Sequence, residues 1–124
     1  MAALDVAQAM IDAWIAQDWE QVVNLFAADG ELVIVPARQT HKGHADIRGH
    51  LNEVATGIES LSFDIRVLLA HGNTVTFERD DVFVYNGKAA RVPVAGIMEV
   101  DGDKVQVWRE YFDGYTMLKA MGRA

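Results

Sequence analysis

Four long β-prone segments in the second half of the chain constrain the fold more than any other feature of the sequence. Turn dipeptides separate these segments: Gly72-Asn73, Asn86-Gly87 and Asp101-Gly102. Asn-Gly and Asp-Gly favour tight hairpins, because both central residues of a type I′ turn need a positive φ. We therefore expect a meander of four antiparallel strands, over residues 61–71, 74–85, 89–100 and 104–113.

Apolar residues recur at three- and four-residue steps through most of the first half of the chain, which is typical of amphipathic helices. The predicted elements there, with one more near the carboxyl end, are helices at 4–16, 19–28, 43–55 and 114–121 and a short strand at 31–36. Helices that precede long hairpins favour an α+β fold, in which they pack on one face of a strongly curved, mostly antiparallel sheet. No linker or repeat divides the sequence, so we expect residues 1–124 to form one such domain.

Two opposite charges stand in the middle of an aromatic strand face. Period-two alternation over residues 74–85 places Arg79 and Asp81 on the face that also carries Phe77 and Phe83. This face is the more aromatic of the two, so it should point towards the concave side of the sheet. Burying such charges is costly unless they pair tightly or serve a function. Two interpretations stay open: a structural ion pair, or a charge pair in a pocket whose carboxyl pKa suits acid/base chemistry.

The orientation of the last strand is not fixed by polarity alone. Glu110 shares one face with Trp108 and Phe112, while Arg109 lies on the other. The first face has more aromatic bulk, and it would bring Glu110 into the same cavity as the first charge pair. Two carboxylates bridged by one guanidinium can keep one carboxyl protonated as an acid and the other ionised as a base. The alternative places Glu110 on the outer surface.

The composition excludes several classes of function. The chain has 11 Lys and Arg against 18 Asp and Glu, a net charge of −7, so we expect no nucleic-acid partner. No segment approaches about 20 consecutive apolar residues, and we expect no membrane partner. The lack of cysteine excludes disulfides, thiolate catalysis and Cys-ligated zinc, and it suits the cytoplasm. The four histidines are expected to be solvent-exposed rather than metal ligands: His41, His44, His50 and His71.

Two segments, FERDDVF (77–83) and VWREYFD (107–113), resemble the motifs of limonene-1,2-epoxide hydrolase. The order ααβαββββα resembles the cone-shaped fold of the superfamily that contains this enzyme, nuclear transport factor 2 and ketosteroid isomerase. The resemblance implies that Arg79 bridges two carboxyl groups, that Asp81 is the general acid, and that Glu110 stands where the family has a water-activating aspartate. It also implies hydrolysis of a small hydrophobic epoxide to a diol by direct attack of water, with no cofactor, metal or covalent intermediate.

The sequence departs from this family on the first strand. There the family has a Tyr and an Asn that help to hold the water, and the matching positions here are Leu32 and Ile34. The alternative is therefore a pocket protein without hydrolase activity, either a polyketide cyclase- or isomerase-like enzyme or a module that binds a small hydrophobic ligand. A third possibility is an assembly protein. We also expect a homodimer formed through the convex face, where Val82 and Val84 interrupt a polar surface. The predicted pocket residues are Leu32, Ile34, Phe77, Phe83, Trp108 and Phe112.

Overall fold

Four helices and six strands make up residues 2–124, the part of the chain that the computed structural model describes. The helices are α1 (Ala3–Ile15), α2 (Trp19–Leu25), α3 (His44–Ala55) and α4 (Gly114–Ala120). The strands are β1 (Phe26–Ile34), β2 (Gln39–Lys42), β3 (Ile58–His71), β4 (Thr74–Tyr85), β5 (Lys88–Asp101) and β6 (Lys104–Tyr111). The α+β class and the four-strand meander agree with the sequence prediction.

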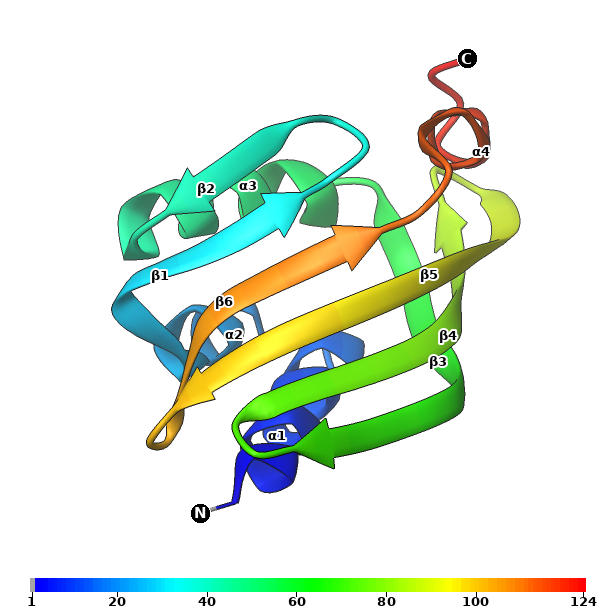
Figure 1. The fold of residues 1–124 in the computed structure, drawn as a ribbon. Coiled ribbons are helices and arrows are strands. Elements are labelled where there is room, and N and C mark those ends of the chain that lie inside the picture. The colour runs from blue at the N-terminus through cyan, green and yellow to red at the C-terminus, as the bar shows by residue number, and fades with distance from the viewer. Residues whose placement is uncertain (1) are drawn as a thin grey trace.

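All six strands belong to one curved sheet, in the order β2-β1-β6-β5-β4-β3. Neighbouring strands pair antiparallel except β1 and β6, which are parallel. Helices α1, α2 and α3 lie on one face of the sheet, and α4 follows the end of β6 at one end of the molecule (Figure 1). The hairpin at Asn86-Gly87 has a positive φ at both residues, 48° and 81°, as the Asn-Gly signal predicts.

Strand bounds differ from the sequence prediction by a few residues, and the two largest differences are the end of the second helix and a strand in the predicted polar loop. The second helix ends at Leu25 rather than at residue 28, because Phe26 has an extended backbone and begins β1. Its side chain is buried beside Trp108, and this tertiary contact outweighs the helical pattern. The segment Gln39–Lys42, which reads as a polar loop, is the edge strand β2 and pairs only with β1. A polar four-residue edge strand has no apolar alternation from which it could be predicted.

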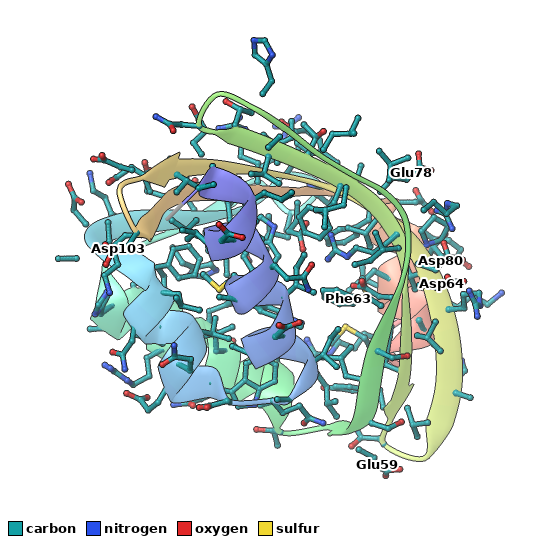
Figure 2. The ribbon with its side chains drawn as sticks, turned by 90° about the horizontal axis from the view of Figure 1, so that it is seen from below. Glu59, Phe63, Asp64, Glu78, Asp80 and Asp103 are labelled. Atoms are coloured by element: carbon teal, nitrogen blue, oxygen red, sulfur yellow. The ribbon has the colours of Figure 1, made fainter. Side chains whose placement is uncertain are left out.

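The inner face of the sheet carries two apolar clusters. The larger contains α1 and α2 residues together with Phe77, Met98 and Trp108. The smaller contains Phe83 and Tyr85, and residues of α4 pack against it. Figure 2 shows α1 inside the curve of the sheet. The larger cluster is thus covered by α1, α2 and α3, whereas the smaller packs against α4.

The outer face of the meander is polar and held by surface ion pairs. Asp80 accepts from Arg66 at 2.9 Å and from Arg91 at 2.9 Å, and Glu78 accepts from Arg66 at 3.0 Å. In Figure 2, Glu78 and Asp80 project outward while Phe63 points into the interior. The alternation predicted for residues 74–85 therefore gives the correct inner and outer faces of β4.

Candidate active site

A single buried guanidinium binds two carboxyl groups on the inner face. Arg79 Nε donates to Asp81 Oδ1 at 2.8 Å, while Nη1 and Nη2 donate to Glu110 Oε2 and Oε1 at 3.0 and 2.5 Å. The bidentate contact fixes the Glu110 carboxylate in the plane of the guanidinium. The Arg79 side chain is only 1% exposed. Polarity alone leaves two orientations open for Glu110, and the family resemblance favours the inner one; the structure has its side chain on the inner face.

Two aromatic rings enclose the guanidinium. The Arg79 Cζ atom lies 4.5 Å from the ring centroid of Phe63 and 4.5 Å from that of Phe77. Each contact is a cation–π interaction in a site from which water is largely excluded. Phe63 is the β3 neighbour of Asp81 in the strand register. The rings leave Arg79 little rotational freedom, so it holds both carboxyl groups in defined positions.

Gly96 on β5 provides the space in which Glu110 sits. It is the register partner of both Phe77 on β4 and Glu110 on β6. A Cβ atom at this position would lie 2.6 Å from Phe77 Cε1 and 2.8 Å from Glu110 Oε2, both closer than van der Waals contact allows. The meander therefore needs a residue without a side chain between these two groups.

We expect Gly96→Ala to displace the Glu110 carboxylate from Arg79 and to slow any reaction in which this carboxylate takes part. Because a displacement near 1 Å can cost ~100-fold, the rate should fall by about that factor. Gly49→Ala is the matched control, since its added Cβ would meet nothing within 4 Å. Steady-state kinetics of both variants, with circular dichroism to verify folding, provide the measurement. Unchanged kinetics in Gly96→Ala would show that the position of Glu110 is not tightly constrained.

The protonation of the cluster follows from its burial. Removal from water raises the pKa of Asp81 to about 6, the neighbouring Arg79 cation opposes that rise, and the Glu110 charge adds to it. Two ionised carboxylates around one guanidinium would leave a net negative charge in a buried site. A proton on Asp81 removes that charge. Below about pH 6 the arrangement therefore presents a carboxylic acid at Asp81, and the protonated fraction of this group decreases as the pH rises above that value.

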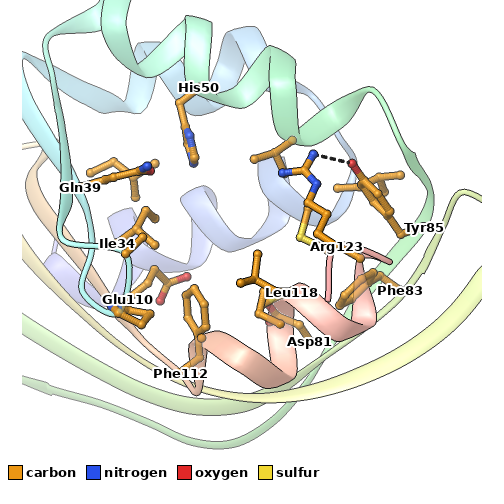
Figure 3. A pocket seen from close by; sticks show the side chains of 18 of the residues that line it. Ile34, Gln39, His50, Asp81, Phe83, Tyr85, Glu110, Phe112, Leu118 and Arg123 are labelled. Carbon is orange, nitrogen blue, oxygen red and sulfur yellow. Dashed lines mark hydrogen bonds between the residues drawn. The ribbon is translucent and has the colours of Figure 1, made fainter.

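A cavity of about 350 Å³ opens beside the two carboxyl groups. Asp81 and Glu110 line it, whereas Arg79 lies behind them. Figure 3 shows Glu110 on the sheet side of this cavity and His50 reaching into it from α3 on the opposite side. Most other lining residues are apolar, from α1, β1, β3, β4, α3, α4 and the segments beside them: Trp14, Leu32, Ile34, Pro36, Ala37, Val54, Ile58, Leu61, Phe83, Phe112, Met117, Leu118 and Met121. The cavity thus suits an apolar molecule that has one polar group facing the acid pair.

The predicted pocket residues divide into two groups. Leu32, Ile34, Phe83 and Phe112 line the cavity. Phe77 and Trp108 do not, since both are buried in the larger apolar cluster. The predictions for these two are therefore corrected. Alternation places a side chain on the inner face, but it does not indicate which part of that face the helices cover.

Other polar cavity residues were not predicted as site residues. Gln39, His50, Tyr85 and Arg123 line the cavity, and Arg123 Nη2 donates to the Tyr85 hydroxyl at 3.1 Å. These residues do not belong to any sequence motif that would have marked them as site residues. Their position depends on how β2, α3 and the residues after α4 fold over the end of the sheet.

The prediction that the histidines are solvent-exposed holds for His71 but not for the other three. His41 and His50 stack with ring centroids 4.1 Å apart, and His41 Nδ1 donates to Asp46 at 3.1 Å. His44 Nε2 donates to the Phe26 carbonyl at 2.9 Å. Packing between α3 and the strands β1 and β2 accounts for this burial. Within residues 2–124, no three His, Cys, Asp or Glu side chains are grouped so that they could hold a metal ion, and no helix is long and apolar enough to cross a bilayer.

Part of the chain is similar in sequence to a known enzyme. The epoxide hydrolase EphG of Mycobacterium tuberculosis is 32% identical over 65 residues, which cover 51% of this chain and 44% of that protein. The match therefore spans less than half the length of this relative.

Solved structures resemble the whole fold. A limonene-epoxide-hydrolase-like epoxide hydrolase of Mycobacterium tuberculosis superposes with a TM-score of 0.81 and 25% identity, covering 98% of this chain and 90% of the other. A hypothetical protein from Catenulispora acidiphila with a ketosteroid isomerase-like fold, in complex with trimethylamine, gives 0.84 and 24%, covering 96% and 93%. A protein from Shewanella putrefaciens, named as a SnoaL-like polyketide cyclase, gives 0.85 and 17%, covering 98% and 97%. The last two similarities concern the fold alone. Residues 7–108 match the SnoaL-like domain, and the chain belongs to the SnoaL-like domain family.

Proposed function

We propose that the protein hydrolyses a small hydrophobic epoxide to a diol by direct attack of an activated water molecule. The observation that carries the proposal is the buried cluster in which Arg79 binds Asp81 and Glu110, with both carboxyl groups open to an apolar cavity. The similarity to two epoxide hydrolases of Mycobacterium tuberculosis supports it.

The chemistry assigns one carboxyl group to each proton transfer. Glu110 accepts a proton from water, and the resulting hydroxide attacks an epoxide carbon. The carbon–oxygen bond breaks, and the departing oxygen takes the proton of Asp81, which gives the diol. A carboxylate has about four lone-pair positions, so Glu110 can accept from water while it accepts from Arg79. Arg79 stabilises the negative charge that moves from Glu110 to Asp81 during the reaction.

Labelled solvent tests this route. In a single turnover in ¹⁸O-water, we expect the label to enter the diol at once, because water is the nucleophile. A covalent carboxylate intermediate would instead deliver oxygen from the protein in the first turnover. Cyclohexene oxide and terpene oxides are suitable substrates, since both are apolar and compact. Unlabelled diol in the first turnover, or no hydrolysis of any epoxide in such a panel, would contradict the proposal.

The pH dependence should show the protonation state of Asp81. This carboxyl must carry its proton to act as an acid, and its pKa is raised to about 6. Its protonated fraction therefore decreases above pH 6, and kcat/KM should fall by roughly tenfold per pH unit well above that value. Rates measured across the pH range, with circular dichroism to verify that the protein stays folded, provide the test. A rate that rises from pH 6 into the alkaline range would exclude Asp81 as the proton donor.

The second candidate function is a pocket protein that does not hydrolyse epoxides, either a cyclase- or isomerase-like enzyme or a binding module. One observation favours it: Ile34 is the β1 register partner of Glu110, and Leu32 lies two residues before it, so neither neighbour offers a hydrogen bond to a water molecule. Under this alternative, a hydrophobic ligand binds with an affinity measurable by calorimetry, while epoxides stay intact. Hydrolysis at a rate above that of the uncatalysed reaction would exclude a pure binding module.

We also propose that the protein is a homodimer that pairs through the outer face of the sheet. Val82 and Val84 are half-buried in the monomer and lie among polar residues of that face. We expect a dimer at micromolar concentration and a shift towards monomer in Val84→Lys, because the variant places an unpaired charge in the interface. Gln8→Lys, on the exposed side of α1, is the control. Sedimentation velocity measures both, and a monomeric native protein would contradict the proposal.

A further inference from the structure

A second, smaller recess adjoins the main cavity. Its volume is about 140 Å³. Apart from Glu53, every residue of the recess also lines the main cavity, so the two spaces lie side by side. The recess is lined by Gln39, His50, Glu53, Val54, Met121 and Arg123.

The recess has a different chemical character from the main cavity. Four of its six lining side chains, Gln39, His50, Glu53 and Arg123, can form hydrogen bonds, whereas the lining of the main cavity is mostly apolar. Asp81 and Glu110 line the main cavity and do not line the recess. In Figure 3, His50 and Gln39 lie across the cavity from Asp81. A ligand that fills both spaces therefore contacts the acid pair and the polar recess with different parts of its structure.

The charges of the recess balance. Arg123 carries a positive charge and Glu53 a negative one. Burial and the nearby His41 lower the pKa of His50, which keeps this ring uncharged at neutral pH, although Glu53 and Asp46 act in the opposite direction. Gln39 can both donate and accept. Neither an anion nor a cation would find a net opposite charge here, whereas a neutral group that both donates and accepts would find partners of both kinds.

We infer that this recess binds a neutral hydrogen-bonding group, a hydroxyl or a carboxamide, on the part of the substrate remote from its epoxide. The substrate class is then an amphiphilic epoxide rather than a plain hydrocarbon epoxide, and this refinement rests on the proposed hydrolase function. The size of the recess is consistent with it, because 140 Å³ corresponds to about five water molecules at ~30 Å³ each, which is enough for one such group and its attached carbon.

Octene oxides that differ only in the terminal group at the far end of the chain test the inference. We expect KM for the hydroxyl-terminated compound to be about fivefold lower than for the methyl-terminated one, the effect of one net hydrogen bond. The carboxylate-terminated compound should gain no such advantage. Equal KM values for the methyl and hydroxyl compounds, or the lowest KM for the carboxylate, would overturn the inference.

Substitutions in the recess test whether its residues cause the lower KM of the hydroxyl-terminated compound. His50→Phe preserves an aromatic ring that can stack on His41 and removes the hydrogen-bonding nitrogens, while Gln39→Leu removes the amide. Both should lower the preference for the hydroxyl compound. Asn52→Leu is the control, because Asn52 is exposed on the same helix as His50 and lines neither cavity. A preference unchanged in the double variant His50→Phe/Gln39→Leu would also overturn the inference.

Binding of the corresponding diols separates this inference from the proposed reaction. Calorimetry with the diol of octene oxide and its hydroxyl-terminated analogue needs no turnover. If no epoxide is hydrolysed but the hydroxyl-bearing diol binds about fivefold more tightly, the hydrolase proposal fails and the polar recess stands. If epoxides are hydrolysed but the two diols bind equally, the inference about the recess fails and the hydrolase proposal stands.

Discussion

Replacing Glu110 with Gln should reduce epoxide hydrolysis by at least ~100-fold, because the amide cannot accept a proton from water. Asp81→Asn should reduce it by at least as much, since the variant has no carboxylic acid proton to give to the epoxide oxygen. Both substitutions preserve the size of the side chain. The apolar cavity should therefore still bind a hydrophobic ligand, and the loss should lie mainly in kcat.

A neighbouring residue offers a matched control for these two variants. Asp80 is adjacent to Asp81 in the sequence, but it lies on the outer face and pairs with Arg66 and Arg91. Asp80→Asn should leave kcat within about twofold of the native value, because Asp80 does not line the cavity and surface ion pairs contribute little to stability. Stopped assays of diol formation measure all three proteins. Native-like rates in either Glu110→Gln or Asp81→Asn would exclude the acid/base mechanism and leave the three side chains as a structural ion cluster.

Replacing Arg79 with Met should lower the free energy of unfolding by about 3–5 kcal/mol, because it leaves two buried carboxyl groups without their cation. This is a large part of the ~5–15 kcal/mol that stabilises a typical domain. Urea denaturation followed by tryptophan fluorescence should show a lower midpoint. The exposed Arg91 is the matched control: it pairs with Asp64 and Asp80 at the surface, and Arg91→Met should shift the urea midpoint far less than Arg79→Met.

Equal stability losses in the two arginine variants would mean that the cluster is hydrated and that its burial is not the source of the raised Asp81 pKa. A variant of Arg79 that cannot be purified in folded form would be replaced by Arg79→Lys. The lysine preserves the charge but cannot form the bidentate contact with Glu110, so a smaller loss in the same direction is expected.

Strand alternation was sufficient to predict one half of the site. In β4 the side-chain period of two and the hairpin at Asn86-Gly87 fix which residues point inward, so Arg79 and Asp81 could be predicted from the sequence. In β6 both faces carry aromatic and charged residues, and only the resemblance to the epoxide hydrolase family indicated the direction of Glu110. Neither strand alternation nor the family resemblance could predict that Phe77 and Trp108 are buried in the core. Their burial depends on how much of the inner face α1 covers.

The other wall of the cavity was less predictable because it depends on contacts between distant segments. His50 reaches the cavity because α3 packs across β1 and β2, and the edge strand β2 was itself missed. Gln39 is the β2 partner of Ile34, a pairing that no local pattern indicates. Arg123 lies beyond α4, and its contact with Tyr85 joins residues that are 38 positions apart in the sequence. Such long-range placements are a property of the tertiary structure and not of any one segment.

Only one strand, β5, separates Arg79 and Asp81 from Glu110, and this has a consequence for how the site forms during folding. A slip of β5 by one residue would turn Gly96 away from Glu110 and place a side chain where the carboxylate must sit. During refolding, tryptophan fluorescence can recover as soon as the core around Trp14 and Trp108 collapses. The proposed epoxide hydrolysis can recover only after both hairpins of β4, β5 and β6 have reached their native pairing. Enzymatic activity would thus serve as a probe of strand registration, separate from collapse.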